Sequence, residues 1–228
     1  MVSRTSTIRP AALGAQVARL LREQIIRGEV MPNTHLVEDQ LAEAFDVSRG
    51  PVRDALRLLD AEGLVESRRR GVFAVGLTSD DIHDLYALRE AVECLAVDLA
   101  MKRASASDWA RGARLVADME TAAARDDHDA FAEADANFHG LLYQLSGHRR
   151  LAAIWAQYSP ILTTLLRVTV SRDADLAASA RDHRRLLDLI ETEDPAATVA
   201  EVRNHLHRSR DRMIQSYESA LSASGTSF

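Results

Sequence analysis

The longest regular feature of the chain is a helical periodicity that runs, without a strand pattern, from about residue 79 to residue 221. Apolar residues recur there at helical spacing, and the breaks in the run fall at residues that cap or interrupt helices. These breaks are Ser107, Asp127, Gly147, Asp173 and Asp194-Pro195. The pattern predicts six helices, at about 79–103, 107–125, 128–146, 148–169, 173–191 and 195–221. We expect them to form an antiparallel six-helix bundle.

The first 76 residues follow a different order. A turn at Met31-Pro32-Asn33 separates the first two helices, and Ser48 is a suitable N-cap for the third, with Pro51 in its first turn. A basic turn, Arg68-Arg69-Arg70, separates two short strands. The predicted helices are 12–27, 38–45 and 49–61, and the predicted strands are 64–67 and 72–75. This order is typical of a winged helix-turn-helix, so we expect a mainly α protein with domains at 1–76 and 77–228.

Composition excludes several classes of protein. Hydrophobic residues make up 46% and charged residues 27% of the chain, which excludes disorder for most of it. The single cysteine, Cys94, excludes an internal disulfide framework and fits a reducing compartment. No run approaches the roughly 18 apolar residues of a membrane span, and the N-terminus lacks the apolar region of a secretory signal. We therefore expect a cytoplasmic protein with no membrane partner.

Charge is distributed unevenly along the chain. Residues 1–76 carry 11 arginines and 10 acidic residues, whereas the remainder carries 17 basic and 24 acidic residues. The acidic remainder should repel nucleic acid, so only the N-terminal third could approach it. A single nearly neutral domain makes few phosphate contacts, so we expect two copies to act together on two half-sites, as a homodimer.

The third predicted helix carries a basic face opposite an apolar stripe. The stripe comprises Val52, Leu56 and Leu59, and the outward face comprises Arg49, Arg53 and Arg57. Guanidinium groups presented from the first turns of a helix can enter a major groove and bond guanine O6 and N7. On an isolated helix such a face is more often simply solvated. Here the basic turn at 68–70 is expected to lie beside the same duplex, which favours DNA binding.

Several motifs between residues 17 and 75 resemble those of a known protein family. They are Leu-Arg-Glu-Gln-Ile-Ile-Arg-Gly-Glu, Leu41-Ala42, Val47-Ser48-Arg49, Pro51-Val52-Arg53, Glu62-Gly63-Leu64-Val65 and Arg70-Gly71-Val72. This stretch resembles the winged helix of the GntR family, which implies a double-stranded DNA operator as partner. The expected DNA-binding residues are Ser48, Arg49, Gly50, Arg53, Arg57, Arg69, Arg70 and Gly71. Gly50 stands where threonine is commonest in the family, which leaves the operator sequence open.

Four ionisable residues fall on the apolar stripes of three bundle helices. They are Asp135 and His139 in 128–146, His183 in 173–191 and His205 in 195–221. A lone inward histidine is usually a hydrogen-bonded core residue, but four such groups without a common partner would be costly to bury. A divalent metal with three nitrogen ligands and one oxygen ligand would satisfy all four. We expect zinc, with nickel and manganese as alternatives.

The motifs around these residues resemble the FCD domain, the effector-binding module of one GntR subfamily. They are Asp-Ala-Asn-Phe-His, Asp-His-Arg-Arg-Leu-Leu and Asn-His-Leu, within residues 80–217. The predicted number of helices, six, is similar to that of the VanR-type branch of this subfamily. The resemblance implies an effector-binding and dimerisation domain in a transcriptional regulator, more commonly a repressor, with a metal-centred cavity for a small organic acid. It also implies that Arg89, in a motif with Glu93, contacts the effector carboxylate, although an ion pair between helices explains this arginine equally well.

Two other functions fit parts of this pattern. A metallohydrolase could hold a catalytic metal with the same four ligands, but no further Glu or His is evidently placed as a general base. A metal-independent regulator could bind a large acyl ligand, which would need an apolar tunnel. We expect a regulator and not an enzyme.

Overall fold

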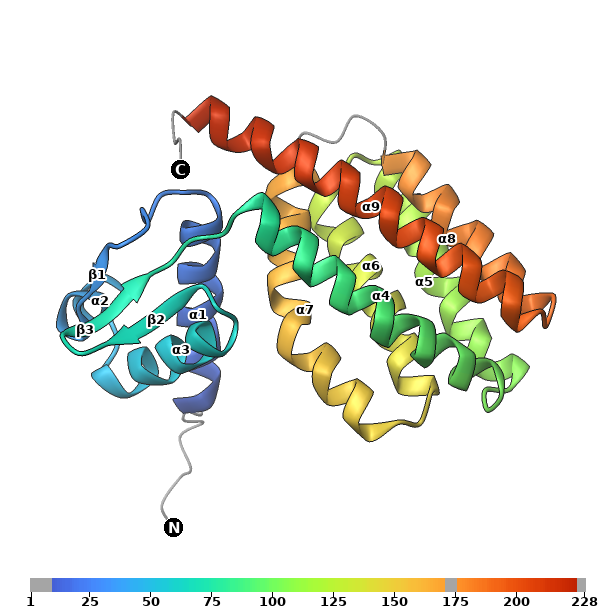
Figure 1. Ribbon diagram of the computed structural model, residues 1–228, viewed down its shortest axis with the longest axis horizontal. Helices are drawn as coiled ribbons and strands as arrows, with labels where there is room; N and C mark the ends of the chain where they lie inside the picture. Colours follow the sequence, from blue (N-terminus) through green and yellow to red (C-terminus); the bar gives the residue numbers. More distant parts are fainter. Residues whose placement is uncertain (1–9, 171–175, 225–228) are drawn as a thin grey trace, which may run out of the picture. The chain divides into compact units, whose positions relative to one another are not determined.

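The computed structural model describes residues 10–170 and 176–224. The chain divides into two compact units, Met1–Leu77 and Thr78–Phe228. Helices dominate both units, and the β-structure is confined to a small sheet in the first (Figure 1). The mainly α fold class is therefore confirmed. In the part of the chain that the structure describes, no helix is long and apolar enough to span a membrane.

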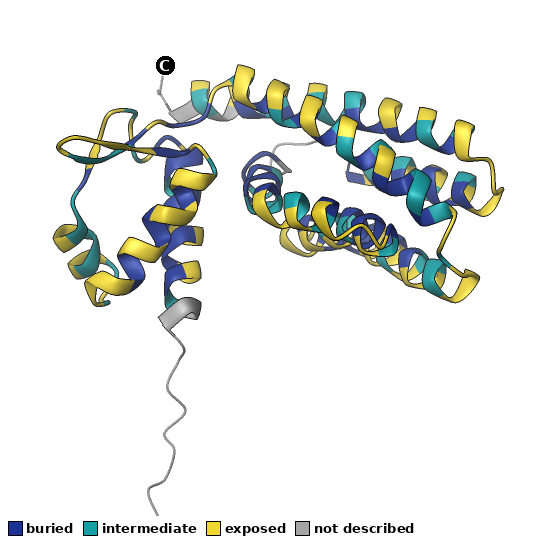
Figure 2. Ribbon diagram, turned by 60° about the horizontal axis from the view of Figure 1, so that its bottom comes forward, coloured by how far each residue is buried: buried dark blue, intermediate teal, exposed yellow. Residues whose placement is uncertain are grey.

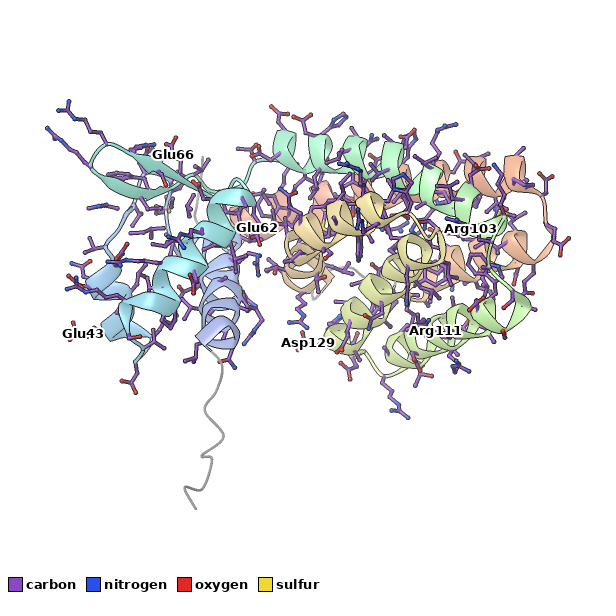
Figure 3. All side chains as sticks on the ribbon, turned by 90° about the horizontal axis from the view of Figure 1, so that it is seen from below. Glu43, Glu62, Glu66, Arg103, Arg111 and Asp129 are labelled. Atoms are coloured by element: carbon purple, nitrogen blue, oxygen red, sulfur yellow. The ribbon has the colours of Figure 1, made fainter. Side chains whose placement is uncertain are left out.

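The first unit is a winged helix-turn-helix. Its elements are α1 (Pro10–Ile26), β1 (His35–Leu36), α2 (Glu38–Ala44), α3 (Arg49–Ala61), β2 (Val65–Arg68) and β3 (Gly71–Ala74). The strands form an antiparallel sheet in the order β1-β3-β2. α1 packs on α3, and their facing side chains, such as Leu21 and Leu59, are buried. A buried ion pair of 2.6 Å between Arg22 and Glu62 joins α1 to the end of α3; Glu62 is labelled in Figure 3.

Two details of this unit differ from the sequence prediction. The sequence predicts no strand at β1, because two residues are too few to show alternation; His35 and Leu36 become a strand by pairing with Phe73 and Val72. Ser48 stands at the N-cap of α3 as predicted, but its side chain makes no capping hydrogen bond. The helix start therefore depends on Ser48 for its extended backbone and not for its hydroxyl.

The second unit is a helical bundle. Over its described residues it contains α4 (Ser79–Met101), α5 (Ala106–Ala124), α6 (His128–Leu145), α7 (Arg149–Val170), α8 (Leu176–Glu191) and α9 (Pro195–Ser224). The predicted six helices are confirmed, with ends within three residues of the predicted ones. The predicted break at Ser107 was wrong by two residues, because Ser105 forms the capping box with Asp108. Asp173 lies outside the described residues.

α6 organises the core of the bundle. It packs against α4, α5 and α7, while α8 packs against α5 and α9. Phe131, Phe138 and Leu142 on α6 are completely buried, and Figure 2 shows buried residues along the inward faces of the helices. Because α6 is surrounded, polar side chains on its inward face can meet side chains from three other helices.

Candidate metal centre and DNA-facing surface

A cluster of polar side chains lies in this core. His139 on α6, His183 on α8 and His205 on α9 are at most 1% exposed, and each offers a ring nitrogen within 4.8 Å of the others. Asp135 Oδ1, one turn before His139, lies 3.0 Å from His183 Nε2 and 4.0 Å from His139 Nε2. The structure therefore brings together the four residues that the sequence predicts as metal ligands.

Two hydrogen bonds determine which ring nitrogens of His139 and His183 carry protons. His139 Nδ1 lies 2.6 Å from Glu93 Oε1, and His183 Nδ1 lies 2.8 Å from the backbone oxygen of Ser179. A carboxylate and a carbonyl oxygen only accept, so both Nδ1 atoms donate. The two Nε2 atoms, 3.2 Å apart, then direct lone pairs toward each other beside the Asp135 carboxylate.

Acceptor atoms that converge in this way need a cation between them. A proton on one imidazole or a divalent metal can supply that charge. Burial and the Arg89 guanidinium lower the pKa of His139, and burial with the neighbouring imidazoles lowers the pKa of His205 well below its ordinary value. Neutral imidazole is the form that binds metal. His205 Nδ1 is also buried with no hydrogen-bond partner among the described residues, so the donor set fits a divalent metal.

Glu93 holds the cluster from α4. Its carboxylate is fully buried and accepts hydrogen bonds from Arg89 Nε at 3.1 Å, from His139 Nδ1 and from the Tyr143 hydroxyl at 3.4 Å. Burial alone would raise the pKa of Glu93, but Arg89 and His139 together lower it to about 2. The sequence motif alone does not indicate this role. The signal that could have found it is the position of Glu93 on the inward face of α4, where a carboxylate needs a partner.

Arg89 lines a small cavity next to the cluster. Arg89 forms an ion pair with Glu93 on its own helix, whereas the alternative interpretation of this arginine was an ion pair between helices. The Nη2 atom of Arg89 is buried and has no hydrogen-bond partner in the described part of the chain. The cavity volume is about 30 Å³, enough for about two water molecules. Its lining residues are Tyr86, Arg89, Asp135, Leu162, Leu166, Thr169, Ser179, Ser209, Arg212, Met213 and Ser216. Arg212 in this lining pairs with Asp182 at 3.4 Å, so the unpartnered Arg89 Nη2 is the group there that can bond an anionic ligand.

The arginines of α3 lie on the surface of the first unit. The side chains of Arg49, Arg53 and Arg57 are 61%, 54% and 80% exposed, and the stripe opposite them is buried. Two of them are paired with carboxylates of α2. Arg53 Nε donates to Glu38 at 2.7 Å, and Arg49 forms an ion pair with Asp39. The sequence pattern does not indicate this pairing, because it depends on how α2 packs against α3.

The turn between β2 and β3 presents two further arginines. Arg69 and Arg70 are exposed, and the described residues offer neither of them an ion pair. Arg68 is held by Asn33 at 2.8 Å and by Glu66, which Figure 3 labels. Gly71 has a φ of +129°, and a Cβ there would lie 2.3 Å from His35 Nε2, so this turn requires glycine.

Gly50 lies in the first turn of α3, among the arginines of its outer face. No heavy atom lies within 4 Å of the place that a Cβ would take at this position. The surface at Gly50 is therefore open, and a larger side chain would fit there without strain.

Both units resemble known protein families. Residues 13–75 match the family described as "Bacterial regulatory proteins, gntR family", and residues 84–208 match the FCD domain. The gluconate operon transcriptional repressor of Bacillus licheniformis is 30% identical over 179 residues, which are 78% of this chain and 72% of that protein. The transcriptional repressor RspR of Escherichia coli K12 is 31% identical over 132 residues, 58% of each chain.

Solved structures of similar proteins share the fold. A GntR family member from Pseudomonas syringae is 30% identical with a TM-score of 0.54, over 90% of this chain and 89% of that chain. McbR/YncC of E. coli has a TM-score of 0.72 at 21% identity, over 95% of this chain and all of the other. At that identity the second comparison shows the fold alone.

Proposed function

This chain belongs to the GntR family of bacterial transcriptional regulators and carries an FCD domain, and we propose that it is a homodimeric repressor controlled by a small carboxylate and a divalent metal. Its relatives are DNA-binding transcriptional regulators, so the metallohydrolase alternative is set aside. Repression is supported by relatives named as repressors, among them two gluconate operon repressors.

The convergence of one carboxylate and three buried imidazoles carries the metal part of this proposal. Asp135, His139, His183 and His205 would hold the ion, for which zinc is the leading candidate and nickel and manganese are alternatives. When bound, the metal supplies a Lewis-acidic position for an oxygen of the effector. Glu93 and the backbone of Ser179 orient the imidazoles.

Arg89 is the proposed effector-binding residue. Its Nη2 is a buried donor without a partner among the described residues, in a cavity that Asp135 also lines. An acidic ligand would satisfy that donor, which an acyl chain would not. The effector can change DNA binding only by binding one arrangement of the dimer more tightly than another.

Metal content of two matched histidine variants tests the centre. His205 and His207 lie on the same helix, but His207 is half exposed and bonds Glu90 at 2.7 Å. We expect His205→Ala to lose the metal and the effector response, because it removes a proposed ligand, whereas His207→Ala should keep both. Elemental analysis with effector titration measures this. Equal metal occupancy in wild type and His205→Ala would mean that the cluster only packs the core and is not the metal site.

The DNA-facing residues are proposed to be Ser48, Arg49, Gly50, Arg53, Arg57, Arg69, Arg70 and Gly71. Arg53→Ala should lower operator affinity by about 1 to 3 kcal/mol, because a bidentate contact to a base edge is lost. Arg70→Ala should instead weaken binding to all sequences more evenly, as expected for a phosphate contact. Binding titrations at one salt concentration with specific and unrelated duplexes separate the two. An unchanged ratio of specific to non-specific affinity in Arg53→Ala would contradict the role of α3.

A further inference from the structure

The outer face of α4 exposes two leucines that have no packing role inside the bundle. In the described part of the second unit, the large hydrophobic side chains exposed to solvent are Leu88, at 48%, and Leu95, at 46%. Both lie on α4, whose inward face already packs through other residues, such as Ile82 and Ala96. Two large apolar side chains two turns apart on one helix form a patch that favours contact with another surface.

The patch belongs to a stripe with charges of opposite sign at its two ends. Asp81, Leu88, Leu95 and Lys102 follow one another at intervals of seven residues, so they lie on one side of the helix. Asp80 and Asp84 add negative charge to the N-terminal end, and all three carboxylates are exposed. At the C-terminal end, Lys102 and Arg103 are exposed cations, and Asp98 pairs with Lys102 at 2.6 Å, so the net charge there is positive. The stripe is therefore acidic, then apolar, then basic.

Such a stripe is complementary to itself when two copies run antiparallel. With a two-fold axis between Ala91 and Val92, Leu88 lies opposite the partner's Leu95, and Asp81 lies opposite the partner's Lys102. A parallel pair would instead place like charges together. Ala91, exposed at the centre of the stripe, has a small side chain that lets two helix backbones approach closely.

A shallow depression beside Leu95 offers an apolar surface for the partner's leucine. It lies between α4 and the first turns of α9, which run side by side (Figure 1), and its volume is about 560 Å³. Its lining is mainly apolar: Cys94, Leu95, Asp98, Pro195, Ala196, Val199, Ala200 and Arg203. In the antiparallel arrangement the partner's Leu88 faces this depression.

We propose that two copies of this chain associate through α4, antiparallel, about an axis between Ala91 and Val92. The inference rests on the proposed function for the expectation of a homodimer, and it adds the surface and its register. Its tests use neither DNA nor metal. A monomeric wild type would contradict the homodimer of the proposed function as well, whereas a dimer that the α4 variants leave intact would contradict the α4 surface alone.

Charged substitutions in the patch should separate the copies. We expect the full-length wild type to sediment as a dimer at micromolar concentration. Leu88→Glu and Leu95→Glu should each raise the dimer dissociation constant at least about 100-fold, because each change occurs twice in a dimer. Leu58→Glu is the matched control, since Leu58 on α3 is 44% exposed, and it should remain dimeric. A monomeric wild type, or a Leu88→Glu/Leu95→Glu double variant with unchanged dimerisation, would overturn the proposal.

Cross-linking tests the register without relying on loss of association. In a Cys94→Ala background, Ala91→Cys places one thiol per copy next to the proposed axis, so a mild oxidant should convert the protein to a covalent dimer. Ala117→Cys, at an exposed position of α5, should give no such product. A dimer by sedimentation that Ala91→Cys cannot cross-link would refute the antiparallel register.

Discussion

Replacing Glu93 with alanine should lower the free energy of unfolding of the second unit by about 3 to 5 kcal/mol. The substitution leaves the buried Arg89 guanidinium without its ion-pair partner and removes the acceptor for His139 Nδ1. Denaturation followed by tryptophan fluorescence measures the loss, because both tryptophans, Trp109 and Trp155, belong to this unit.

Glu90→Ala is the matched control on the same helix. Glu90 pairs with Arg203 and His207 at the surface, where both partners are about half exposed, so its loss should cost about 0 to 1 kcal/mol. Since the pKa of Glu93 is lowered from 4.5 to about 2, its stabilising contribution is complete above pH 4.5 and is lost as the pH falls toward 2. Glu93→Ala should remove this part of the pH dependence. Equal losses for the two variants would contradict the buried network.

Removing the metal should destabilise the second unit nearly as strongly. The proposed ligands come from α6, α8 and α9, so a bound ion links three helices in the folded state only. At a free metal concentration 1,000 times the dissociation constant, this adds about 4 kcal/mol. A chelator should therefore lower the melting temperature of wild type and of His207→Ala, and leave that of His205→Ala unchanged. A wild-type protein with metal content confirmed by elemental analysis, but with the same melting temperature after chelation, would argue against the site.

The helices and the inward histidines could be predicted from sequence because helical phase is a local property. Asp135 and His139 are one turn apart, and His183 and His205 share faces with leucines, so each residue's own helix indicates its direction. The metal, effector and DNA roles of these residues stay predictions until the experiments above are done.

Contacts between elements could not be predicted in the same way. The hydrogen bond from His139 to Glu93 joins residues 46 positions apart, and it depends on the relative placement of α4 and α6. The strand β1 exists only because β3 lies beside it. The carboxylates of α2 lie in a segment whose sequence indicates a short helix but not its partner.

The ion pairs between α2 and α3 change what a DNA duplex would gain from those arginines. Glu38 and Asp39 already neutralise Arg53 and Arg49, so bringing a phosphate to either guanidinium exchanges one anion for another. Such an exchange gains less than a phosphate contact from an unpaired arginine, because the ion pair with the carboxylate must first be broken. Unrelated DNA sequences would therefore be held mainly through Arg57, Arg69 and Arg70, which no carboxylate of α2 holds. If these arginines bind DNA as proposed, the carboxylates of α2 would compete with the duplex for them and would favour selectivity over tight general binding.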